Sequence, residues 1–143
     1  MSSVTKVRIT WDNVWEDLNH LVKEIEDSGC VFEFVVGISR GGLVPAAMIA
    51  RQLHLPLVGM DPMECVQQFG ANKVLIVDDI FDTGDTLNHI YEDGGEHQVY
   101  CCLYNKNILI DELHMLRKPH FAVDAGTQEW IVFPWESEND DER

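Results

Sequence analysis

Residues 73–86 read K-V-L-I-V-D-D-I-F-D-T-G-D-T. Val74–Val77 is an apolar and mostly β-branched run, which predicts a buried strand. Thr83–Thr86 forms a Gly/Thr turn, and Leu87–Tyr91 can begin a helix. The N-terminus of a helix presents free backbone N–H groups and favours negative charge. The stretch therefore predicts an anion-binding site between a strand and a helix.

Three carboxylates accompany this turn, because Asp78, Asp79 and Asp82 fall within five residues. They would repel a phosphate unless they bind sugar hydroxyls or a Mg²⁺ ion that the phosphates share. Thr83 and Thr86 add hydroxyl donors. The combination is typical of a site for a phosphorylated sugar that carries a metal ion.

The stretch closely resembles the signature with which type I phosphoribosyltransferases bind 5-phosphoribosyl pyrophosphate (PRPP). That signature is an apolar strand, two acidic residues, two apolar residues and D-T-G-x-T, and this chain matches every position. The resemblance implies that Asp78 and Asp79 hold the ribose hydroxyls and that Asp79 also reaches Mg²⁺. Asp82, within the same PRPP-binding segment, is the implied general base. The 5′-phosphate is assigned to Thr83, Gly84, Asp85 and Thr86.

A second strand, glycine loop and helix precede the first. Val31–Ile38 predicts a central strand and Leu43–Leu53 a helix, and the residues between them read S-R-G-G. A glycine pair alone indicates only a tight turn. The longer segment S-R-G-G-L-V-P-A resembles the pyrophosphate-binding loop of the same family, especially its purine branch. This implies pyrophosphate binding by Ser39, Arg40, Gly41 and Gly42.

The segment Asp61–Asn72 departs from the family pattern. Active relatives carry a long mobile loop here that closes over the site. This segment is short, contains no lysine or arginine, and predicts a short helix or turn. We therefore expect the usual lid to be missing or vestigial.

The C-terminal third supplies the candidates for base binding. Val99–Tyr104 predicts a strand, and Lys106 follows at the edge where open α/β sheets bind ligands. Purine-specific relatives place a lysine there to donate to the 6-oxo group. The segment W-I-V-F-P-W, residues 130–135, resembles the hood of bacterial xanthine–guanine phosphoribosyltransferases. It implies that Trp130 and Ile131 bind the base.

Composition limits the possible functions of the chain. Its 143 residues suit one domain with a real core, and a net charge of −15 argues against a nucleic-acid surface. No apolar run approaches the length that spans a membrane, and residues 1–10 contain no secretory signal. The cysteines predict buried thiols of a cytoplasmic protein. They are Cys30, Cys65, Cys101 and Cys102.

We expect one α/β domain, residues 1–136, with a mostly parallel sheet of four or five strands flanked by helices. A small hood would come from about residues 1–10 and 107–136. Residues 137–143 form an acidic tail with the composition of a disordered segment. Relatives form dimers or tetramers, and Trp11 and Trp15 are candidates for such an interface.

The implied reaction joins a 6-oxopurine to PRPP with Mg²⁺ and releases pyrophosphate. Which purine is used depends on backbone contacts and stays open. The alternative from another class is a non-catalytic module that binds a nucleotide or PRPP on the same fold, which the short lid segment favours. A receiver domain needs its acidic pair near the N-terminus, and a phosphoaspartate phosphatase needs D-x-D-x-T, so both disagree with this sequence.

Overall fold

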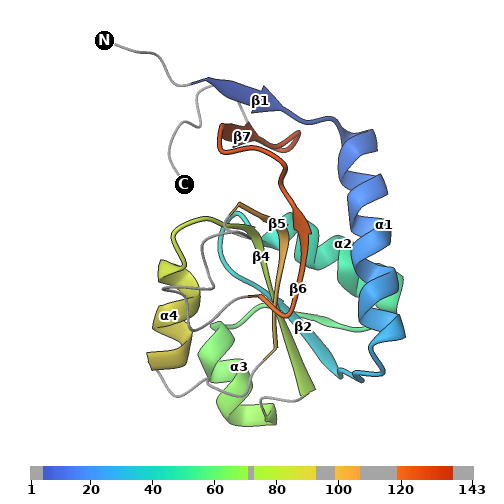
Figure 1. The fold of residues 1–143 in the computed structure, drawn as a ribbon. Helices are drawn as coiled ribbons and strands as arrows, with labels where there is room; N and C mark the ends of the chain where they lie inside the picture. Colours follow the sequence, from blue (N-terminus) through green and yellow to red (C-terminus); the bar gives the residue numbers. More distant parts are fainter. Residues whose placement is uncertain (1–4, 71–72, 93–98, 107–118, 137–143) are drawn as a thin grey trace.

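A computed structural model describes residues 5–70, 73–92, 99–106 and 119–136. Its centre is a five-stranded sheet in which every neighbouring pair is parallel, in the order β3-β2-β4-β5-β6 (Figure 1). The predicted acidic tail and residues 107–118 of the predicted hood lie outside the described residues. The strands of this sheet are β2 (Phe34–Gly37), β3 (Leu57–Val58), β4 (Val74–Phe81), β5 (Val99–Asn105) and β6 (Phe121–Asp124).

Helices cover both faces of the sheet, as the sequence predicted. On one face, α1 and α2 pack with Leu75 and Val77 of β4. On the other, α3 and α4 pack with Val74 and Ile76. Successive side chains of β4 thus pack on opposite faces, as in a central strand whose two faces are both covered. The helices are α1 (Trp11–Asp27), α2 (Leu43–Leu53), α3 (Pro62–Phe69) and α4 (Asp85–Glu92).

The first helix follows directly from its sequence pattern. Thr10 is its N-cap, and Thr10 and Asn13 form a reciprocal capping box. Trp11 and Trp15 are 46% and 41% exposed, so neither is a core residue in the single chain. Its buried side chains recur at helical spacing along one face and are Val14, Leu18, Leu21, Val22 and Ile25.

The strand β4 is longer than the sequence predicted. It continues past Val77 to Phe81, so the acid pair Asp78–Asp79 lies inside the sheet and not in the turn after it. The side chains of Val74–Val77 pack on alternate sides of the sheet. Beyond the acid pair this alternation is reversed, because Ile80 packs on the α1 side and Phe81 on the α3 side. The two carboxylates can lie inside a buried strand because the carboxyl-terminal end of β4 borders a cavity. Strand β2 is shorter than the predicted segment Val31–Ile38.

The segment where relatives carry a lid contains the short helix α3, in agreement with the prediction of a helix or turn. Asp61 caps it by accepting from the N–H of Met63 at 2.9 Å and from the N–H of Glu64 at 3.4 Å. Cys65 and Val66 are buried in the core cluster beneath the sheet. The helix therefore covers a face of the sheet, and its packing holds it away from a lid position.

A second, two-stranded sheet lies above the carboxyl end of the main sheet (Figure 1). In it β1 (Lys6–Arg8) pairs in parallel with β7 (Trp130–Val132). Aromatic rings connect this small sheet to the main core, since Phe133 stacks on Tyr104 and Trp135, and Trp135 contacts Trp11. The strand β6 lies within the range we assigned to the hood, yet it pairs with β5 and extends the main sheet.

The four cysteines are free thiols. Cys65, Cys101 and Cys102 are buried as predicted, but Cys30 is exposed because it follows the end of α1 at the surface. Burial raises the pKa of the Cys101 and Cys102 thiols well above the ordinary value, so both stay protonated. Within the described part of the chain, no helix has the length and apolarity needed to cross a membrane.

Candidate active site

A cavity of about 490 Å³ opens at the carboxyl ends of β2 and β4. Ligands of open α/β sheets bind at this edge. The loops that follow both strands line the cavity, so two segments far apart in sequence share one site. Its polar and charged lining residues are Ser39, Arg40, Asp78, Asp79, Asp82, Thr83, Asp85, Thr86, Tyr100 and Trp130, with Gly41 and Gly84 contributing backbone.

The acid pair lies at the floor of this cavity. Asp78 is 7% exposed and Asp79 is 5% exposed. Asp78 Oδ1 accepts from the Asp79 N–H at 2.8 Å, and Asp78 Oδ2 accepts from the Tyr100 hydroxyl at 2.8 Å. Burial, and then the charge of Asp78, raise the pKa of Tyr100 well above its ordinary value, so the phenol acts as a donor. Sequence reasoning missed Tyr100, because nothing marks one residue within an apolar strand.

The glycine loop packs directly on the acid pair. A Cβ atom at Gly41 would overlap the Asp79 carboxylate, and one at Gly42 would overlap the carbonyl oxygen of Val77. The peptide bond between Ser39 and Arg40 is cis. We predicted that both glycine amides would face a diphosphate. The Gly42 N–H instead donates to the Ile38 carbonyl at 2.9 Å, and Gly42 lies outside the cavity lining, so its role is close packing.

The turn after β4 leads into α4 as the sequence predicted. Gly84 is buried and has a φ of +86°, a conformation that glycine adopts readily. The Asp85 N–H donates to Thr83 Oγ1 at 3.3 Å, and helical hydrogen bonding begins with the Asn88 N–H and the Gly84 carbonyl. Thr83, Asp85 and Thr86 are exposed at the cavity edge, where the first turn of α4 presents its N-terminus.

Asp82 lines the cavity, and Lys106 lies next to Asp82 but is not among the residues that line the cavity. The Lys106 ammonium lies 3.9 Å from Asp82 Oδ2, with the lysine side chain 6% exposed and the aspartate side chain 54% exposed. The Lys106 N–H donates to the Phe81 carbonyl at 3.0 Å, and its carbonyl accepts from Gln128 Nε2 at 2.6 Å. Lys106 is therefore a held, largely buried cation and not a solvated surface lysine.

The two predicted base-binding residues of β7 have different positions. Trp130 lines the cavity from above. Ile131 is 2% exposed and belongs to the core cluster, so its side chain is not part of the cavity lining. The strand alternates its side chains, and this places one of the two neighbours toward the site and the other toward the core.

The sequence similarity to known proteins extends over almost the whole chain. The xanthine-guanine phosphoribosyltransferase of Nitratidesulfovibrio vulgaris (strain DP4) is 31% identical over 147 residues, covering 91% of this chain and 84% of that protein. The xanthine-guanine phosphoribosyltransferase of Chromohalobacter salexigens is 30% identical over 145 residues, covering 90% and 82%. A comparison with models of protein families finds no match.

Solved structures show the same fold. The purine phosphoribosyltransferase from Pyrococcus horikoshii has a TM-score of 0.68 and 28% identity, covering 96% of this chain and 98% of that one. The Helicobacter pylori xanthine-guanine-hypoxanthine phosphoribosyltransferase has a TM-score of 0.68 and 18% identity, covering 93% of each chain, a likeness of fold alone.

The fold and the relatives together define a phosphoribosyltransferase, a transferase of purine salvage. Within that class, the chain belongs to the family of the xanthine-guanine phosphoribosyltransferases. The fold class, the family and the enzymatic nature predicted from the sequence are confirmed, and nothing in the comparisons favours the non-catalytic alternative.

Proposed function

We propose that this protein transfers the 5-phosphoribosyl group of PRPP to a 6-oxopurine (guanine, xanthine or hypoxanthine) and releases pyrophosphate. The observation that carries the proposal is that one cavity contains groups suited to the sugar and to the phosphates, and that a lysine lies next to Asp82 of its lining. The acid pair suits the sugar, the Thr83–Thr86 turn suits a phosphate, and the Asp82–Lys106 pair suits a base.

The chemistry requires a carboxylate at the position of Asp82. The C1–O bond to the diphosphate breaks with its electron pair leaving on the diphosphate, and a bond from C1 to a purine nitrogen forms. The purine must then lose a proton, which Asp82 accepts as general base. Lys106, held 3.9 Å from Asp82, donates to the 6-oxo group. Arg40 and the Gly41 backbone, which line the cavity, face the leaving diphosphate.

The donor set fits a Mg²⁺ ion that arrives with the substrate. Mg²⁺ in phosphate sites is held by one or two carboxylates, substrate phosphates and water. Asp79 offers such a carboxylate at the cavity floor, beside the diphosphate loop at Gly41. In the described ranges, no group of three or more metal-ligating side chains provides a cage for the metal alone. When bound, the ion would neutralise charge that builds on the leaving diphosphate.

The purine would lie between Lys106, which follows β5, and Trp130 of the hood. Trp130 offers an aromatic face at the cavity edge for stacking. Ile131 is buried, so its proposed contribution to base binding is limited to its backbone and to support of the neighbouring tryptophan. This division of roles agrees with the alternation along β7.

Turnover tests the proposal directly. Purified protein with PRPP and Mg²⁺ is offered guanine, xanthine, hypoxanthine and adenine separately, and nucleotide formation is followed. We expect product from a 6-oxopurine and a fall in kcat of about 10²- to 10⁴-fold in Asp82→Asn, with PRPP affinity retained. Absence of turnover with every base, together with metal-dependent binding of PRPP, would instead support the binding module.

Three broader expectations remain proposals. We propose one catalytic domain over residues 1–136, with β1 and β7 in its hood. A homodimer or homotetramer would cover the exposed face of α1 that carries Trp11 and Trp15. A cytoplasmic location agrees with the four free thiols. Light scattering on the purified protein measures the number of subunits, and a monomer would contradict the proposed assembly.

A further inference from the structure

We propose that Tyr100 is a positioning residue that fixes the Asp78 carboxylate for the ribose hydroxyls of the substrate. The inference rests on the proposed function, which places the sugar at the acid pair. It concerns a residue that contacts Asp78 and that the signature sequence does not contain. Tyr100 lies on β5, whereas the signature lies on β4 and in the turn after it.

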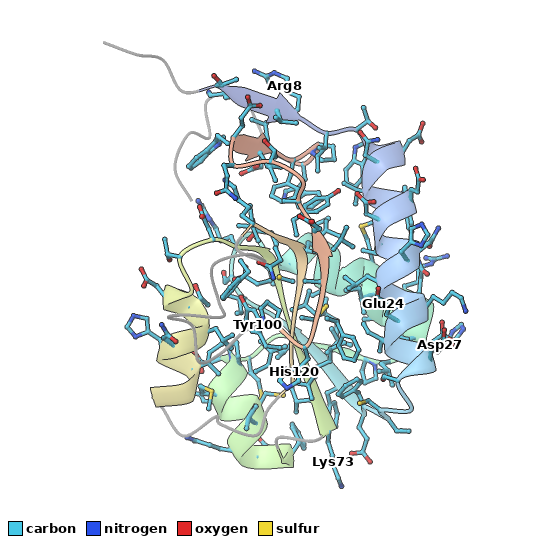
Figure 2. All side chains as sticks on the ribbon, viewed as in Figure 1. Arg8, Glu24, Asp27, Lys73, Tyr100 and His120 are labelled. Carbon is cyan, nitrogen blue, oxygen red and sulfur yellow. The ribbon has the colours of Figure 1, made fainter. Side chains whose placement is uncertain are left out.

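The surroundings of Tyr100 combine a rigid ring with a hydroxyl at the cavity. Tyr100 has no exposed surface and belongs to the core cluster that includes Leu87 and Ile90 of α4. Its label in Figure 2 lies at the middle of the molecule, among the strands. The residue also lines the cavity. The ring is thus fixed by packing, and the hydroxyl is carried to the cavity floor at a defined point.

The hydroxyl determines how Asp78 can turn. One carboxylate oxygen accepts from the Asp79 N–H and the other from the Tyr100 hydroxyl, each at 2.8 Å. Rotation of the carboxylate would break one or both hydrogen bonds inside a buried site, which is costly. Each oxygen retains a further lone pair to accept a substrate hydroxyl. Two protein donors therefore fix the plane in which Asp78 presents its remaining acceptor capacity.

The same strand offers a matched control. Tyr104 also donates from its hydroxyl to an aspartate, at 2.5 Å from Asp17 Oδ2 on α1. Burial also raises its pKa well above the ordinary value, so it too acts as a donor. Tyr104 and Asp17 are absent from the cavity lining. Tyr100→Phe and Tyr104→Phe therefore remove the same atom and the same kind of hydrogen bond, one at the site and one away from it.

The readout is the contribution of the sugar hydroxyls to binding. Calorimetry compares 5′-GMP with its 2′,3′-dideoxy analogue on the wild type and both variants, and steady-state kinetics give KM for PRPP and for the base. In Tyr100→Phe we expect the preference for the hydroxylated nucleotide to shrink by about 10-fold or more, as for loss of a hydrogen bond to a charged group. KM for PRPP rises by a similar factor, whereas KM for the base stays within about twofold.

Tyr104→Phe is expected to lower the melting temperature and leave the hydroxyl preference unchanged. Inorganic pyrophosphate with Mg²⁺, a probe without ribose, should bind Tyr100→Phe as it binds the wild type. Asp78→Asn and the double variant complete a cycle, in which the two single changes should be non-additive in the hydroxyl preference. If the melting temperature of Tyr100→Phe falls too far for kinetics at the working temperature, the calorimetric cycle is measured at a lower temperature.

The outcomes separate this inference from the proposed function. Turnover by the wild type, with an equal hydroxyl preference in Tyr100→Phe and Tyr104→Phe, would overturn the role of Tyr100 alone. A uniform loss of kcat and of every affinity in Tyr100→Phe would assign it a merely structural role. A wild type that neither turns over any purine nor binds PRPP or GMP would overturn the proposed function, and the role of Tyr100 with it.

Discussion

Gly41 shows how one residue without a side chain joins the two halves of the site. The loop after β2 approaches the acid pair so closely that a Cβ atom at this position would overlap the Asp79 carboxylate. The diphosphate loop and the proposed metal ligand therefore depend on one another. This is a steric requirement of the assembled site, since Gly41 lies in the loop after β2 and Asp79 lies on β4.

We predict that Gly41→Ala disables the site and that Gly59→Ala does not. The new methyl group must displace Asp79 or the loop, and an error of about 1 Å in a catalytic geometry costs about 100-fold in kcat/KM. A Cβ at Gly59 meets no atom within 4 Å. Kinetics with PRPP and a melting curve are measured for both variants. A Gly41→Ala enzyme with the kcat/KM of the wild type would contradict the close approach.

In both β4 and β5, the side of the sheet on which the side chains pack reverses near the acid pair. In β5, Tyr100 and Cys102 pack on the side of α3 and α4, whereas Tyr104 packs on the side of α1. The register between β5 and β6 shifts between Cys101 and Tyr104. In β4, Ile80 and Phe81 likewise pack on the sides opposite to those that the alternation of Val74–Val77 predicts. A regular strand would place Tyr100 and Tyr104, four positions apart, on the same side of the sheet. Because of the reversal, Tyr100 supports the site and Tyr104 holds α1.

His120 fastens the start of β6 to β5. The backbone N–H of His120 donates to the Tyr100 carbonyl at 2.8 Å, and the ring Nδ1 of His120 accepts from the backbone N–H of Tyr100 at 3.2 Å (both residues are labelled in Figure 2). Burial lowers the pKa of His120 below 6.5. A protonated ring has no acceptor at Nδ1. The link is therefore formed by the neutral histidine.

The free energy of unfolding should depend on pH through this residue. A lowered pKa in the folded state means that the unfolded chain binds more protons, so stability is present above pH 6.5 and is lost as the pH falls through the folded value. His120→Asn retains an acceptor without titrating. Urea unfolding at about pH 7.5 and about pH 5.5 should show a smaller loss for His120→Asn than for the wild type. Equal losses would exclude His120 as a source of the pH dependence.

At the scale of the whole molecule, charge opposes the binding of the substrate. The chain carries a formal charge of −15, and PRPP is also a polyanion. The described residues that line the cavity include four aspartates and one arginine. Mg²⁺ and backbone N–H groups must therefore offset a repulsion that the protein itself creates. In the described part of the chain, no charged lid closes over this cavity, because α3 is packed into the core.

Salt should consequently assist the substrate. Raising KCl from about 20 mM to about 150 mM shortens the Debye length to about 8 Å and screens the repulsion. We expect kcat/KM for PRPP to rise about two- to fivefold at a fixed free Mg²⁺ concentration. Neutral ribose, whose binding should not change with salt, is the control ligand. A fall in kcat/KM with salt would show that Arg40 and the helix N-termini dominate the local field.

The sequence by itself determined the local units and the family. Strand, acid pair, glycine turn and helix follow one another in residues 74–92, and the row of apolar residues in α1 is buried as its spacing predicts. Such patterns can be read because period and capping depend on neighbours along the chain. The Thr83–Thr86 turn could be recognised in the same way, whereas the role of the S-R-G-G loop was inferred from its resemblance to the family.

Only the tertiary structure decided which side chains meet. Tyr100 and Asp78 lie on different strands, and Lys106 and Asp82 each follow the end of a different strand. The contact between Gly41 and Asp79 joins a loop to a strand. The extension of β4 through the acid pair and the burial of Ile131 belong to the same group. They depend on strand order and register, which bring residues remote in sequence into contact.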